Sequence, residues 1–152
     1  MSHMFENCSA LIKIDFSDID ANNVEDLSYM FDSCSSITSI DFSKFNTIRV
    51  LDMSHLFQGC ISLTELVISS INTANVRDFS YMFDSCHLLK NLDLSNFVTA
   101  NAKNISHMFH FCSSLKKINL KSFLTINIED TSGLFAHCKE LDKIDISNFE
   151  LI

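Results

Sequence analysis

Apolar residues between positions 24 and 34 recur at the spacing of a helix. Val24, Leu27, Met30, Phe31 and Cys34 lie at i, i+3, i+6, i+7 and i+10, which places them on one face of a short helix. Side-chain oxygens of Asp and Ser cap helix N-termini by accepting a backbone N–H. The pattern therefore predicts a short helix, capped by Ser28 and by an acidic column made of Asp26, Asp52, Asp78, Asn104 and Asp130.

The next stretch changes to the spacing of a strand. Ile40 and Phe42 are two residues apart, with Ile37 before them and Phe45 after them. Alternate residues of a strand share one face, so this stretch is expected to be a short strand with one buried side. Equivalent triplets are Leu63/Leu66/Ile68, Leu89/Leu92/Leu94, Leu115/Ile118/Leu120 and Leu141/Ile144/Ile146.

Both patterns belong to a strict 26-residue repeat with no insertion or deletion. The clearest columns are the cysteines and phenylalanines: Cys8, Cys34, Cys60, Cys86, Cys112, Cys138, and Phe5, Phe31, Phe57, Phe83, Phe109, Phe135. A single short unit cannot bury its apolar face, whereas stacked units can. We therefore expect an α/β fold: a right-handed, leucine-rich-repeat-like solenoid of about six coils, with one short parallel sheet and short helical turns. Residues 1–152 form one domain in this interpretation, with units starting near 2, 28, 54, 80, 106 and 132 and no recognisable caps.

The repeat also carries a finer phrase. It reads M-F-x-x-C-x-x-L-x-x-L-x-L-S-x-F-x-T-x-x-V-x-D-M-S. This phrase resembles the BspA-like class of leucine-rich repeats, a 26-residue repeat of bacterial and mycoplasma surface proteins. The resemblance covers the chain from Ser2 to Phe149. It implies a non-enzymatic protein at the cell surface or outside the cell, which binds proteins or mediates adhesion.

Composition narrows the possible partners. The chain has a formal net charge of -8 and no run of Lys or Arg, which argues against nucleic acid. No apolar run approaches the roughly 20 residues needed to cross a bilayer, and the first residues do not resemble a signal peptide. Only two glycines and no proline are present, so Thr and Asn columns are expected to satisfy the turns instead.

The cysteines and histidines do not form a recognisable reactive set. Each cysteine occupies one phase of the repeat, as a small apolar filler would, and parallel neighbours about 5 Å apart suit a disulfide poorly. No Cys or His spacing is typical of zinc. Neighbouring pairs such as His137-Cys138 do not face each other on a helix. We therefore expect mainly buried free thiols, no catalytic residue, no metal and no cofactor.

Two surfaces remain as candidates for binding. The first is the solvated column of the strands, made of Asp15, Asp41, Asp93, Asn119 and Asp145. It reads as a recognition strip or as weak Ca²⁺ sites, or simply as a position that needs a short polar residue.

The second surface is the pair of ends, where core columns lack a neighbouring repeat. It comprises Met4, Phe5, Leu11, Ile14 and Phe16 at one end and Phe135, Leu141, Ile144, Ile146 and Phe149 at the other. Because the two ends are in matching phase, a non-closing contact between copies would give a filament. The sequence therefore leaves two functions open: protein binding or adhesion with a host protein, or a structural subunit that assembles end to end.

Overall fold

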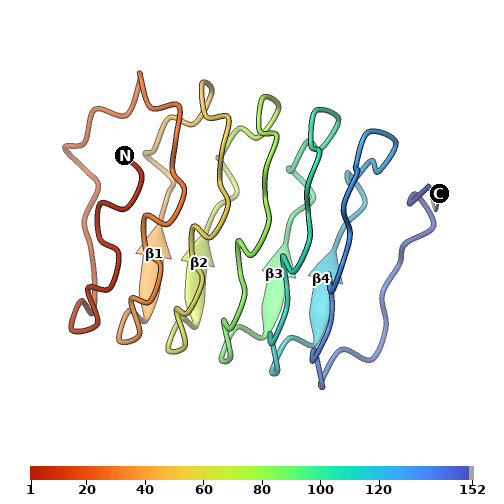
Figure 1. The fold of residues 1–152 in the computed structure, drawn as a ribbon. Helices are drawn as coiled ribbons and strands as arrows, with labels where there is room; N and C mark the ends of the chain where they lie inside the picture. The colour runs from red at the N-terminus through yellow and green to blue at the C-terminus, as the bar shows by residue number, and fades with distance from the viewer. Residues whose placement is uncertain (151–152) are drawn as a thin grey trace.

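The structure is a computed structural model, and it describes residues 1–150. The chain winds through successive coils that lie side by side in one row, with the N-terminus at one end and the C-terminus at the other (Figure 1). The strands are β1 (Ser39–Asp41), β2 (Glu65–Val67), β3 (Asn91–Asp93) and β4 (Lys117–Asn119). β1 pairs in parallel with β2, and β3 with β4, each in a register of 26 residues: Ile40 faces Leu66, and Leu92 faces Ile118.

The predicted α/β fold class is wrong. Residues 1–150 contain no helix, the strands form two two-stranded sheets rather than one, and the coils form an open stack rather than a closed solenoid. The physical reason lies in the backbone hydrogen bonds of the expected helix. Tyr29 N–H donates to the Ser54 carbonyl at 3.1 Å, and Phe31 N–H donates to the Leu56 carbonyl at 3.0 Å. Donors that bond to the next coil are not free to close helical turns.

Two tight turns take the place of the helix in each coil. Met30 N–H bonds to the Leu27 carbonyl and Cys34 N–H to the Phe31 carbonyl. The third residue of each turn has a positive φ, 56° at Tyr29 and 59° at Ser33, as type II turns require. The same two positions are left-handed in all six coils, and both glycines of the chain occupy them: Gly59 at φ 67° and Gly133 at φ 63°.

The acidic column predicted to cap helices caps these turns instead. Asp26 Oδ1 accepts the Ser28 N–H at 2.8 Å, and Asn104 Oδ1 accepts the Ser106 N–H at 2.9 Å. The column also joins the coils, because parallel bridges link Asp26 to Asp52, Asp52 to Asp78, Asp78 to Asn104, and Asn104 to Asp130. The side chains are thus correctly placed as caps, but the element that they cap was predicted incorrectly.

The strand ladder is interrupted where one continuous sheet was expected. Lys116 N–H donates to the Lys90 carbonyl, and Thr64 N–H to the Thr38 carbonyl. No corresponding bond joins Lys90 to Thr64 within the described chain, which separates β2 from β3. The stretch around Ile144 in the last coil is likewise not assigned as a strand.

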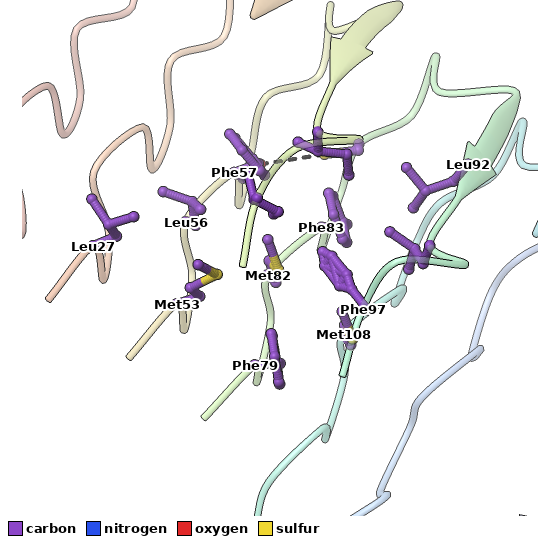
Figure 2. Close-up of a cluster of buried hydrophobic side chains, with 14 of the residues drawn as sticks. Leu27, Met53, Leu56, Phe57, Phe79, Met82, Phe83, Leu92, Phe97 and Met108 are labelled. Carbon is purple, nitrogen blue, oxygen red and sulfur yellow. Dashed lines mark hydrogen bonds between the residues drawn. The ribbon is translucent and has the colours of Figure 1, made fainter. Parts of the chain in front are cut away.

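The core lies inside the stack and consists of aligned side chains. The rings of Phe5, Phe31, Phe57, Phe83, Phe109 and Phe135 stack one on the next, with centroid separations of 5.3–6.1 Å. Met53, Leu56, Phe57, Met82 and Phe83 lie together in neighbouring coils, with Leu92 on the strand side (Figure 2). Burial of these apolar surfaces between coils is the main force that holds the stack together.

Candidate binding surfaces

The predicted acidic strip lies at the carboxyl ends of the short strands. Asp41, Asp93 and Asn119 are the last residues of β1, β3 and β4. Their side-chain oxygens accept backbone N–H groups two residues further on, at 2.7 Å from Ser43, 3.0 Å from Ser95 and 3.3 Å from Lys121. Asp15 and Asp145 form the same turn with Ser17 and Ser147. Each of these side chains therefore fixes its own turn.

These hydrogen bonds also set the charge of the strip. The Ser43 hydroxyl and N–H lower the pKa of the Asp41 carboxyl, and the Ser95 N–H and hydroxyl lower that of Asp93. Asp15 and Asp145 have lowered pKa values for the same reason. The four carboxylates are exposed, ionised at neutral pH and held in one orientation.

Two shallow hollows lie along the strip. One, of about 500 Å³, is lined by Asp15, Asp41, Ser43, Lys44 and Glu65 among others. The other, of about 730 Å³, is lined by Asn91, Asp93, Lys117, Asn119 and Lys143 together with apolar side chains. Val67, the strip residue of β2, is 43% exposed and lies at the point where the sheet is interrupted. The strip therefore consists of two halves.

The structure does not support a metal centre on this surface. Residues 1–150 contain no group of three or more His, Cys, Asp or Glu side chains that could hold a metal ion. Each strip carboxylate instead contacts its own turn. The weak Ca²⁺ sites that the sequence left open therefore have no ligand cluster in the described chain.

The cysteines form a ladder of free thiols. Cys34, Cys60, Cys86 and Cys112 are fully buried, and each Sγ donates to the carbonyl of a phenylalanine 29 residues earlier, for example Cys60 to Phe31 at 3.3 Å. Burial raises the pKa of the Cys34 thiol to about 11 and raises those of Cys60, Cys86 and Cys112 further. Cys8 is exposed and Cys138 is partly buried, so only four of the six are the buried fillers that were expected.

A ladder of aromatic rings was not predicted from the sequence. His3, Tyr29, His55, Tyr81 and His107 stack with centroid separations of 4.2–4.8 Å and interplanar angles of at most 13°. The alternation of His and Tyr at one phase of the repeat is visible in the sequence, but it does not by itself predict that the rings stack. Beside this ladder, Asp84 accepts hydrogen bonds from Gln58 at 2.8 Å and contacts His110 at 3.0 Å.

The predicted end residues lie on the two outer coils, at opposite ends of the row (Figure 1). Met4 is 52% exposed and Ile146 is 39% exposed, whereas Phe16 is buried. Beside Ile146 is an open hollow of about 680 Å³, lined mainly by Ile128, Leu134, Phe135, Ile144 and Phe149. Phe5, Leu11 and Leu141 are partly buried. One end thus exposes Met4, and the other end has an apolar hollow.

Comparison with known proteins places the chain in a family. The family model described as "Mycoplasma protein of unknown function, DUF285" matches residues 1–67 and 36–149. The chain belongs to this family. The DUF285 description assigns no activity, and neither the comparison with curated proteins nor that with solved structures found a match. Within residues 1–150 there is no helix of the length and hydrophobicity that crossing a membrane requires.

Proposed function

We propose that this DUF285 protein is a non-catalytic protein-binding module that contacts its partner through the acidic strip. The observation that carries the proposal is the set of exposed carboxylates that are fixed by their own turns. Because Asp41 and Asp93 are already oriented by Ser43 and Ser95, binding would cost little side-chain ordering. The resemblance to BspA-like surface repeats supports a role in adhesion at the cell surface.

The charges of the strip indicate the chemistry of the partner. Asp41, Glu65 and Asp93 carry negative charge on three consecutive coils, and the protein as a whole has a net charge of -8. A cationic segment of a protein is the complement of this arrangement, and its association would be steered by charge and weakened by salt. The flanking Lys13, Lys117 and Lys143 restrict the proposed site for a cationic segment to the second, third and fourth coils.

The test measures binding of a fluorescent lysine-rich peptide by anisotropy. Asp41→Asn combined with Asp93→Asn removes two charges while leaving an amide oxygen to accept each turn N–H, as Asn119 does naturally. We expect the double variant to bind the peptide at least several-fold more weakly, with an unchanged circular dichroism spectrum.

The matched control removes the same charge away from the strip. Asp20→Asn combined with Glu140→Gln changes two exposed residues outside the strip, and it should retain the affinity of the unmodified protein. Equal losses in both double variants would mean that net charge alone drives binding. Absence of peptide binding to the unmodified protein would reject a cationic partner.

A further inference from the structure

The coils are joined by a directional row of backbone hydrogen bonds. At the first joint, His3 N–H donates to the Ser28 carbonyl at 3.0 Å, Phe5 N–H to the Met30 carbonyl at 2.9 Å, and Asn7 N–H to the Asp32 carbonyl at 2.7 Å. The same three bonds recur at every joint up to the last, where His107, Phe109 and Phe111 donate to Ser132, Leu134 and Ala136. In this row, each coil therefore offers donors to the next coil and acceptors to the preceding one.

The two outer faces carry the unused halves of this row. In the last coil, the N–H groups of Gly133, Phe135 and His137 have no hydrogen-bond partner within residues 1–150. In the first coil, the carbonyls of Ser2, Met4 and Glu6 accept no hydrogen bond from the described residues. Unpaired backbone groups at an edge of this kind are a template for another chain. The donors and acceptors at the two ends are complementary in number, spacing and direction.

The side chains at the two ends are complementary as well. Met4 is 52% exposed, while Met30, Met82 and Met108 in the same column are fully buried against neighbouring coils. The hollow at the other end is lined by Leu134, the last residue of that column, and by Phe135, the last ring of the phenylalanine stack. The exposed Met4 thus lies at the same phase of the repeat as Leu134, which lines the apolar hollow at the other end.

We infer that the last coil of one copy binds the first coil of a second copy, in the register of the internal joints. Gly133, Phe135 and His137 then donate to the Ser2, Met4 and Glu6 carbonyls of the second copy. Met4 of that copy packs into the hollow against Leu134, and its Phe5 ring extends the stack beyond Phe135. The inference does not depend on the proposed function.

The direction of this row of hydrogen bonds favours a head-to-tail contact over a symmetric dimer at these faces. Two copies of the last coil would place N–H donors against N–H donors, and two copies of the first coil would place carbonyls against carbonyls. A head-to-tail contact pairs the Gly133, Phe135 and His137 donors with the Ser2, Met4 and Glu6 acceptors, and its repetition gives a chain of molecules rather than a closed pair.

The exposure of the Cys8 thiol reports whether this contact forms. At each internal joint the cysteine Sγ donates to a phenylalanine carbonyl of the preceding coil, as Cys34 does to Phe5 at 3.1 Å. In the head-to-tail contact, Cys8 of the second copy occupies this position over the Phe135 carbonyl. The exposed Cys8 thiol would become buried like those of Cys34 and Cys60.

The experiment is sedimentation of the unmodified protein and of two end variants over a range of concentrations. Met4→Asp should block one end and Ile146→Asp the other, so that each variant alone sediments as a monomer. An equimolar mixture of the two should give one-to-one dimers and nothing larger, because each pair retains one intact joint. Ile48→Asp, at an equally apolar position on the side of the stack with 52% exposure, should associate like the unmodified protein.

Labelling gives a second readout, which does not measure the size of the assembly. Thiol labelling of Cys8 and hydrogen exchange at the Phe135 N–H should both slow as the concentration rises, whereas labelling in the Ile146→Asp variant should not change. A monomeric unmodified protein at every concentration would overturn the inference. Self-association of either end variant alone, or failure of the mixture to form dimers, would also overturn it.

Discussion

At the scale of single residues, the left-handed backbone at two positions of the repeat is set by the stack and not by the type of side chain. Ten non-glycine residues within residues 1–150 have a positive φ, a conformation that costs L-residues about 1–2 kcal/mol. They occupy two positions of the repeat, filled by residues as different as Tyr29, Ser33 and Phe111. Because the bonds between coils fix these turns, the stack imposes a conformation that the residue types alone do not favour.

Gly133 provides a test of this effect. It ends the ring ladder, and a Cβ added there would lie 2.5 Å from the His107 ring. Gly133→Ala should lower the free energy of unfolding by about 1 kcal/mol or more, from the left-handed backbone and from displacement of His107. In urea denaturation, the loss should be smaller in a His107→Ala background, where the ring is absent.

Gly59 is the matched control for this comparison of single and double variants. It also has a left-handed backbone, at φ 67°, but a Cβ added there would meet Ser33 instead of a ring. Gly59→Ala should show no coupling to His107→Ala. Equal coupling at both glycines would mean that the effect does not arise from contact with the ring.

At the scale of the coil, buried polar side chains replace the glycine and proline turns that the chain lacks. Thr47, Thr73, Thr99 and Thr125 are buried. The Thr99 hydroxyl donates to the Leu124 carbonyl at 2.9 Å and accepts the Leu124 N–H at 2.8 Å. One hydroxyl thus satisfies both backbone groups of a residue in the next coil, as the sequence predicted for this column in general terms.

Replacing the Thr99 hydroxyl should lower the free energy of unfolding. Thr99→Val preserves shape but leaves the Leu124 N–H and carbonyl without a partner, so unfolding should become easier by about 1–3 kcal/mol. Thr99→Ser, which keeps the hydroxyl, should cost less. Denaturant titration of the two variants measures the difference between their free energies of unfolding. A Val variant as stable as the Ser variant would show that water satisfies these groups.

At the scale of the whole molecule, short carboxylate turns recur along the stack and respond together to acid. Hydrogen bonds from the serine two residues on lower the pKa of Asp15, Asp41, Asp93, Asp130 and Asp145. A lowered folded-state pKa contributes stability above the unfolded value, near 3.8, and that contribution disappears as the pH falls through the folded value. Burial raises the pKa of Asp32, which acts in the opposite direction.

Because five carboxylates act in one direction, the free energy of unfolding should decrease as the pH falls below about 4. Urea denaturation at about pH 5 and about pH 3 measures this decrease in the free energy of unfolding. The Asp41→Asn and Asp93→Asn double variant should lose less stability between these pH values, because its amides do not titrate. An identical decrease in the double variant would assign the acid sensitivity to other groups.

The sequence by itself determined the period, the columns and their chemistry. Strict 26-residue spacing was sufficient to predict stacked coils with aligned Phe, Cys, Thr and Asp, because repeated units bury their apolar faces only against one another. It also identified Asp41 and Asp93 as exposed and Met4 and Ile146 as end residues.

Only the tertiary structure decided what each segment becomes. Spacing of i, i+3 and i+7 fits a helix, but it also fits two consecutive turns that present the same side chains to the core. The difference depends on whether the N–H groups of Tyr29 and Phe31 bond within the segment or to Ser54 and Leu56 in the next coil. That choice is made by a neighbour 25 residues away, and local periodicity carries no information about it.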